Sequence, residues 1–142
     1  MTIEIRAAAP SDAAAVLSLW VEAETHATTT DDTESVARLI SHDPGALLVA
    51  EADAMLVGSV IAGWDGWRGS IYRLAVRPSH RRDGLGRALV TAAERRLAGL
   101  GSPRLQANVV TDDDQAMAFW RGSGWEEQHD RTRFVREQPQ PG

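Results

Sequence analysis

The sequence predicts a mixed α/β fold in which helices cover a single sheet. Three observations point to it: short apolar strands between residues 46 and 76, amphipathic helix patterns on both sides of them, and a strand–helix–strand succession from residue 71 to 110. The predicted order is strand, two helices, three strands, helix, strand, helix, strand. This order gives an antiparallel meander followed by a βαβ unit.

The first part of the chain predicts one strand and two helices. Residues 3–6 alternate between apolar and polar side chains, as a half-buried strand does. The segment after Pro10 begins with residues that start helices, and apolar residues follow at helical spacing up to Trp20. A threonine-rich loop is expected over residues 24–32, and a short helix over residues 34–41.

The middle of the chain predicts the meander. Two apolar runs, residues 46–50 and 55–62, flank a turn and predict a hairpin. Residues 64–69 form a second turn around Asp65-Gly66, a dipeptide that is frequent in hairpin turns. Residues 71–76 are then the third strand, in which alternation places Tyr72 on the face opposite to Ile71 and Arg73.

The last part predicts a long helix, a strand, a second helix and a final strand. An apolar stripe runs along residues 85–97, and residues 105–110 form the next strand. The second helix begins near Thr111, where Asp112, Asp113 and Asp114 suit the positive end of its dipole. Residues 125–135 are expected to be the last strand.

Length and composition favour one soluble domain. The chain has 142 residues, from which we expect a single domain over residues 1–137 and a flexible tail over residues 138–142. A net charge of −5 argues against a general nucleic-acid binder. The chain has no cysteine and no signal-peptide or membrane-spanning pattern, so we expect a cytoplasmic protein without a metal or a membrane partner.

The most informative segment is residues 81–87, Arg-Arg-Asp-Gly-Leu-Gly-Arg, between a strand and a helix. Such a turn presents free backbone N–H groups and the positive end of a helix dipole, and its arginines add charge. It predicts a pyrophosphate site. A P-loop would need Lys and Ser or Thr after Gly86, where Arg87 and Ala88 stand, and a dinucleotide fingerprint would need glycine at Leu89.

Residues 74–90 closely resemble the acyl-CoA-binding motif of the GCN5-related N-acetyltransferase (GNAT) family. Arg81, Gly84 and Gly86 match the family pattern of Arg or Gln, two residues, Gly, one residue, Gly or Ala. Residues 116–125 are similar to a later helix motif of the family, and the predicted order of elements also agrees. The resemblance therefore covers nearly the whole chain.

The resemblance implies the GNAT acyl-CoA N-acyltransferase fold, in which the strand at 71–76 splays from the strand at 105–110 and acetyl-CoA lies between them. The pantetheine arm would bond the strand backbone, which would also supply an N–H for the oxyanion, and the turn would hold the pyrophosphate. The implied cofactor-binding residues are Leu74, Ala75, Val76, Arg81, Arg82, Asp83, Gly84, Leu85, Gly86, Arg87 and Asp113, the last standing where the family has an asparagine.

The implied activity is acetyl transfer from acetyl-CoA to a primary amine of a small molecule or protein by direct attack. The family's proton-donating tyrosine corresponds here to Trp120, and a carboxylate often used as base corresponds to Asn108. Tyr72, the single tyrosine, is the third catalytic candidate. Because the usual catalytic groups are absent, a catalytically weak acyl-CoA-binding module that senses or assists a partner is the alternative.

The acceptor is the least defined part. Candidate substrate-binding residues are Glu22, His26 and Asp65, and each also has a structural interpretation, a solvated helix end for the first two and an Asp-Gly turn for the third. An acidic lining from Glu22, Glu24, Asp31, Asp32 or Asp65 would suit a cationic amine. His80 is expected on the surface of the turn, and exposed tryptophans suggest a possible homodimer.

Overall fold

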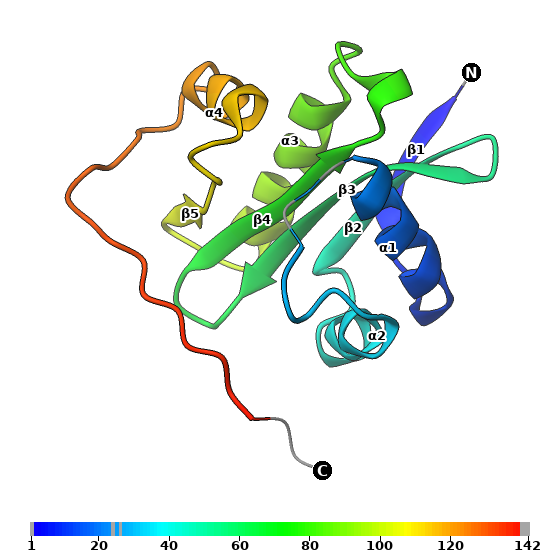
Figure 1. Cartoon of the computed structure of the whole chain (residues 1–142), viewed down its shortest axis with the longest axis horizontal. Coiled ribbons are helices and arrows are strands. Elements are labelled where there is room, and N and C mark those ends of the chain that lie inside the picture. Colours follow the sequence, from blue (N-terminus) through cyan, green and yellow to red (C-terminus); the bar gives the residue numbers. More distant parts are fainter. Residues whose placement is uncertain (1, 24, 26, 140–142) are drawn as a thin grey trace. The chain divides into compact units, whose positions relative to one another are not determined.

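The computed structural model describes residues 2–23, 25 and 27–139, and it divides into two compact units, Met1–Asn108 and Val109–Gly142. In the first unit, five strands form one sheet in the order β1-β2-β3-β4-β5 (Figure 1). Neighbours pair antiparallel except β4 and β5, which pair parallel. The strands are β1 (Ile3–Ala7), β2 (Leu47–Ala52), β3 (Met55–Trp64), β4 (Gly69–Val76) and β5 (Leu105–Ala107).

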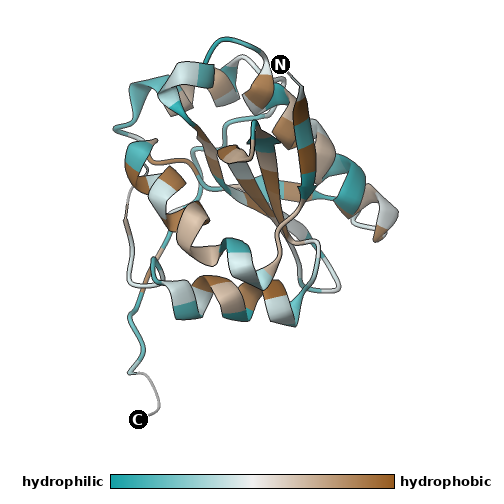
Figure 2. Cartoon of the chain, turned by 90° about the vertical axis from the view of Figure 1, so that its right-hand side faces the viewer, coloured by the Kyte–Doolittle hydropathy of each residue, from teal (hydrophilic) through white to brown (hydrophobic). Residues whose placement is uncertain are grey.

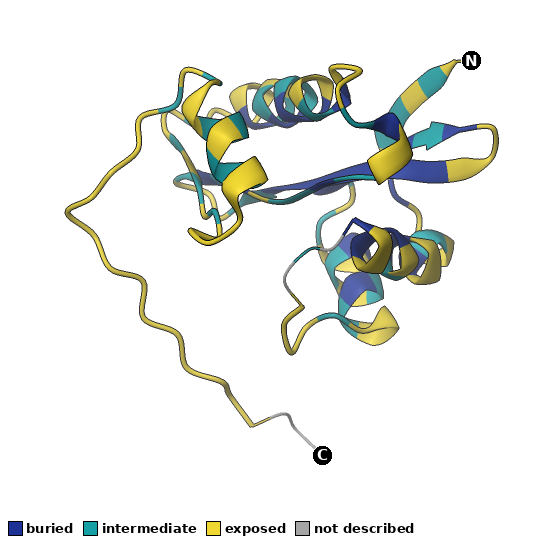
Figure 3. Cartoon of the chain, turned by 45° about the horizontal axis from the view of Figure 1, so that its top comes forward, coloured by how far each residue is buried: buried dark blue, intermediate teal, exposed yellow. Residues whose placement is uncertain are grey.

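Helices cover both faces of this sheet (Figure 3). One face carries α3, and the other carries α1 and α2, with buried strands between these layers. Apolar residues gather along the central strands in Figure 2, as this burial requires. The helices of this unit are η1 (Pro10–Asp12), α1 (Ala13–Glu22), α2 (Thr33–His42), η2 (Pro78–His80) and α3 (Leu85–Gly99).

Helix α3 approaches the sheet closely because a glycine lies beneath it. A Cβ on Gly58 would lie 2.8 Å from a methyl group of Leu89 and 3.2 Å from the carbonyl oxygen of Ala75. A side chain there would push α3 away from β3. This packing holds the start of α3, and with it the turn that precedes the helix, against the end of β4.

Strand β4 contains a bulge that the alternation pattern did not reveal. Its register with β3 shifts between the pairs Ser59↔Ala75 and Ile61↔Tyr72, and Arg73 has φ +54°. A bulge places two residues opposite one, so the expected alternation breaks there. Tyr72 pairs with Ile61, which belongs to the core under α1, and the Arg73 guanidinium lies over Trp20 of α1. Tyr72 and Arg73 are therefore both on the α1 side, and the expectation that they face opposite ways is wrong.

The pairing of β4 with β5 is short and leaves an open edge. It runs only from Gly69↔Leu105 to Ile71↔Ala107, so from Tyr72 to Val76 β4 pairs with β3 on one side and has no described strand on the β5 side. The sequence predicted a longer strand, residues 105–110, and the structure ends it at Ala107. The predicted separation of the two strands is thus present.

The second unit contains α4 (Asp114–Arg121) and an extended segment. Asp113 caps the helix by accepting a hydrogen bond from the Ala116 N–H at 3.0 Å. The predicted strand at 125–135 is wrong, because those residues are irregular and almost all exposed. Eight consecutive polar residues, 126–133, offer no apolar face whose burial would offset the entropy cost of ordering a strand. In the described residues, no helix has the length and apolarity to cross a membrane.

Candidate functional site

The connection from β4 to α3 contains two residues in the left-handed region. Arg82 has φ +73°, and Gly84, the residue that precedes α3, has φ +79° and ψ +9°. Glycine adopts this conformation freely, whereas any other L-residue is strained in it. Left-handed residues within a turn bring successive N–H groups toward one side, a concave arrangement that binds anions.

The N–H groups of residues 82–87 donate to no other group within the described chain. Those of Leu85, Gly86 and Arg87 lie in the first turn of α3, where no helix residue can accept their hydrogen bonds. They lie at the positive end of a 15-residue helix. The arrangement fits a phosphate or pyrophosphate.

The arginines of this turn have different roles. The Arg81 guanidinium donates to the carbonyl of Val76 at 3.2 Å and to that of Ala23 at 3.0 Å, so it fixes the turn to β4 and to the end of α1. Arg82 and Arg87 are exposed, and their guanidinium groups contact no carboxylate in the described chain. These two side chains are therefore available to an anionic ligand.

His80 is buried, and the expectation of a surface residue is wrong. Its side chain is 8% exposed, Nδ1 lies 2.9 Å from the Ser79 hydroxyl, and Nε2 has no hydrogen-bond partner. The short η2 helix turns the ring inward below the loop. His80 thus belongs to the support of the turn rather than to its exposed surface.

Tyr72 lies where the free edge of β4 begins. Its side chain is 40% exposed, and its hydroxyl makes no hydrogen bond in the described chain. A Cβ on Gly63 would lie 3.5 Å from that hydroxyl, so the glycine leaves room for the ring. Partial burial raises the pKa of the Tyr72 phenol, which keeps it protonated and able to donate.

The other two catalytic candidates differ in their setting. Asn108 follows β5 at the end of the first unit and is exposed. Trp120 lies in α4 of the second unit, with its ring edge-on to Trp125 at 4.9 Å and to Phe119 at 5.5 Å between ring centroids. An indole N–H donates a hydrogen bond but does not exchange protons at neutral pH, so Trp120 is a packing residue of its unit.

The acidic residues proposed for the acceptor have partners within the chain. Glu22 pairs with Arg77, Asp31 with Arg73, and Asp32 caps α2 by accepting from the Ser35 N–H at 2.7 Å. Asp65 accepts from the N–H groups of Trp67 at 2.8 Å and Arg68 at 2.7 Å, and these bonds, that of Arg68 above all, lower its pKa. The structure thus gives Asp65 the turn role that was its alternative.

Among the acidic residues expected to line the acceptor site, each one that the structure describes has a partner within the chain. Glu24 and His26, the other members of the expected lining, lie outside the described residues. The sequence analysis did not single out Arg73 as a functional candidate, although it forms an extensive polar network. A single arginine in a strand does not indicate a functional role in the sequence, because the bulge at Arg73 and the loop that contacts it are features of the tertiary structure.

Comparison with known sequences gives a family match across most of the chain. Residues 13–125 match the acetyltransferase (GNAT) family. An acetyltransferase from Pectobacterium atrosepticum is 36% identical over 118 residues, which cover 83% of this chain and 84% of that protein. An acetyltransferase from Yersinia enterocolitica is 36% identical over 126 residues and 89% of each chain.

Comparison with solved structures gives the same fold at low sequence identity. The PaiA N-acetyltransferase from Thermoplasma acidophilum in complex with coenzyme A aligns with a TM-score of 0.78 at 18% identity, over 90% of this chain and 92% of that one. AAC(6')-Iy in complex with a CoA-acetylneamine bisubstrate analogue aligns at 0.76 and 18% identity, over 97% and 99%.

Proposed function

The chain belongs to the acetyltransferase (GNAT) family, and from this premise we propose that it transfers an acetyl group from acetyl-CoA to a primary amine of a small molecule or protein. The observation that carries the proposal is the turn at residues 82–87, with its unpartnered N–H groups and αL Gly84, beside the open edge of β4. An acyl-CoA needs both features, an anion site for its pyrophosphate and a free strand edge for its amide-containing arm.

The turn would hold the pyrophosphate through backbone N–H groups, with Arg82 and Arg87 adding charge. Arg81 would not touch it, because its guanidinium is used by two carbonyls of the chain. The pantetheine arm would lie along Leu74, Ala75 and Val76, where β4 pairs with β3 but has no described strand on the β5 side. An N–H of that segment would stabilise the oxygen of the reacting carbonyl.

The amine would attack the thioester carbonyl, forming a C–N bond as the C–S bond breaks and the CoA thiolate leaves. The amine loses a proton to water or a base, and the thiolate gains one. We propose the Tyr72 hydroxyl as the donor for the thiolate, because it is unpartnered, protonated at neutral pH and adjacent to the open edge. Trp120 and Asn108 would contribute contacts rather than proton transfer.

The acceptor class is left broad because the described acidic side chains are paired. One structural relative is an aminoglycoside 6'-N-acetyltransferase, and another was solved with a CoA-acetylneamine bisubstrate analogue, so neamine belongs in a test panel. Spermidine and a short peptide with a free N-terminal alanine extend the panel to a polyamine and to a protein-like amine.

The test measures release of CoA thiol from acetyl-CoA with each amine. The proposal expects amine-dependent release, and Tyr72→Phe should lower kcat while the KM for acetyl-CoA stays unchanged. Thermal stabilisation by acetyl-CoA, and not by ATP or NAD, should accompany it. Tight acetyl-CoA binding with no turnover of any amine would favour an acyl-CoA-binding module instead.

The affinity for acetyl-CoA should also depend on the positive charge of the turn. Arg82→Gln and Arg87→Gln should each weaken acetyl-CoA binding by roughly three- to tenfold, and more at low salt, because exposed charges are screened by ions. Arg95→Gln is the matched control, since Arg95 is exposed on the same helix outside its first turn. Equal binding by all three variants would contradict the proposed phosphate site.

A further inference from the structure

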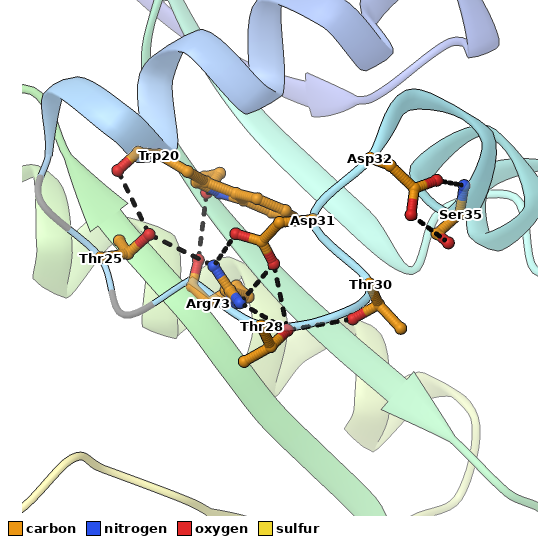
Figure 4. A network of polar contacts seen from close by, with 9 residues as sticks. Trp20, Thr25, Thr28, Thr30, Asp31, Asp32, Ser35 and Arg73 are labelled. Atoms are coloured by element: carbon orange, nitrogen blue, oxygen red, sulfur yellow. Dashed lines mark hydrogen bonds and ion pairs between the residues drawn. The ribbon is translucent and has the colours of Figure 1, made fainter. Parts of the chain in front are cut away.

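One guanidinium joins the loop between α1 and α2 to the bulge of β4 (Figure 4). Arg73 binds both carboxylate oxygens of Asp31, with Nη2–Oδ1 at 2.6 Å and Nη1–Oδ2 at 3.0 Å. It also donates to the hydroxyl oxygens of Thr25 and Thr28, each at 3.2 Å. The Arg73 side chain thus connects β4 to a loop residue, Thr25, that lies 48 positions earlier in the sequence.

The other side of the guanidinium lies against Trp20. The Arg73 Cζ is 4.6 Å from the centre of the indole, a distance typical of a cation–π contact. The indole N–H donates to the Ser59 hydroxyl at 2.9 Å, and that hydroxyl donates to the Arg73 carbonyl at 3.0 Å. Both the side chain and the backbone of Arg73 are therefore fixed.

These contacts hold Arg73 in a costly conformation. A non-glycine residue with positive φ is strained, and such strain persists only where the surroundings impose it. The side chains of Arg73 and Asp31 are only 14% and 16% exposed. Because this pair is mostly covered, bidentate and stacked, it differs from exposed ion pairs, which contribute little to stability.

The network lies at the part of β4 where pairing with β5 has ended. Arg73 stands two residues beyond Ile71, the last residue of β4 that pairs with β5, and next to Tyr72. A loop bonded to its guanidinium therefore lies within one side-chain length of the open edge. Under the proposed function, the thioester lies at that edge and the amine must approach beside this loop.

Resting on the proposed function, we propose that Arg73 and Asp31 clamp residues 27–32, between α1 and α2, as a fixed wall of the amine-acceptor site. Arg73 is a positioning residue in this proposal, because it acts through the loop and touches neither acetyl-CoA nor the reacting atoms. The pairing also neutralises Asp31, so this carboxylate orders the loop instead of binding a cationic acceptor.

The test compares Arg73→Gln, Arg73→Lys and Asp31→Asn with the control Asp32→Asn. The control removes the same charge one position away, and asparagine still caps α2. Amide hydrogen exchange of residues 27–32 should become about tenfold faster in Arg73→Gln and Asp31→Asn, in line with a lost charge-assisted hydrogen-bond pair. Arg73→Lys should lie between them and wild type, since lysine keeps the charge without the bidentate geometry.

Steady-state kinetics use the fastest of neamine, spermidine and the alanine peptide as acceptor. The proposal expects a rise in acceptor KM of about tenfold for Arg73→Gln and Asp31→Asn, an unchanged KM for acetyl-CoA and little change in kcat. A double variant no worse than either single one would show that the two residues act together. Unchanged exchange would overturn the proposal, and so would faster exchange without a change in acceptor KM.

Failure of the proposed function would look different. In that case the wild-type protein would transfer acetyl to no amine or would not bind acetyl-CoA, and the wall of an acceptor site would be overturned with it. The amide hydrogen exchange of the folded variants would still show whether Arg73 and Asp31 hold residues 27–32.

Discussion

The glycine that precedes α3 allows a sharp test of the turn. In Gly84→Ala, alanine must adopt φ +79° and ψ +9°, at a cost of roughly 1–2 kcal/mol. A Cβ there would meet no atom within 4 Å, so steric clash adds nothing. Alanine also restricts the unfolded chain, which returns about 0.4–1 kcal/mol. We expect a net loss of about 1 kcal/mol in the free energy of unfolding.

The same helix supplies the matched control at its other end. Gly99 is the last residue of α3, it has no positive φ, and a Cβ there also meets no atom within 4 Å. Gly99→Ala should therefore raise the free energy of unfolding, by about 0.5 kcal/mol, because alanine favours the helix. The two variants make the same chemical change and should shift stability in opposite directions.

Urea denaturation measures both variants, with the midpoint shifting and the slope unchanged. Gly84→Ala should in addition lose affinity for acetyl-CoA, because relaxation of the strained alanine would redirect the N–H groups of the turn. Gly99→Ala should bind as wild type does. The reasoning is refuted if Gly84→Ala is as stable as wild type, or if both variants shift stability in the same direction.

Three further predictions concern other sites. Tyr72 is the only tyrosine of the sequence, so near-ultraviolet absorbance should show its deprotonation at a pH above the free value of about 10. The stability that its protonated form adds is present below that pH and falls as pH rises through the folded pKa. Ionisation of Tyr72 at or below the free value would contradict this prediction. Gly58→Ala should cost about 1–3 kcal/mol in urea unfolding because the new Cβ meets Leu89, and a neutral effect would show that α3 can shift freely. The hydrogen bonds from Arg6 lower the pKa of Asp12. The free energy of unfolding should therefore be higher for wild type than for Asp12→Asn above about pH 4, and this difference should vanish as pH falls through the folded pKa. A difference that stays constant with pH would be inconsistent with this reasoning.

The elements of the first unit were largely readable from the sequence. The apolar run in residues 55–62 and the apolar stripe in residues 85–97 predicted β3 and α3 to within two residues, because burial requires apolar residues in a continuous run in a covered strand and in a stripe along a helix. The strand predicted at 125–135 failed because its aromatic and apolar ends flank a charged centre without any alternation.

The candidate site was only partly readable. The glycine spacing predicted a turn with free N–H groups before α3, since a left-handed glycine before a helix is a local requirement; its use as an anion site stays a prediction. The burial of His80 and the two hydrogen bonds from Arg81 to backbone carbonyls could not be predicted from the sequence, because both depend on what packs against these side chains.

The sequence by itself determined the family, the order of the elements as far as α4 and the left-handed glycine turn before α3, because local periodicity and backbone conformation depend on neighbouring residues. Only the tertiary structure decided how the charged side chains pair. The bulge in β4 turned Arg73 toward α1, and the fold brought Asp31 to it across 42 positions. Such pairings depend on where distant segments meet, and for that reason the acidic residues of the sequence are used here to hold loops and helix ends.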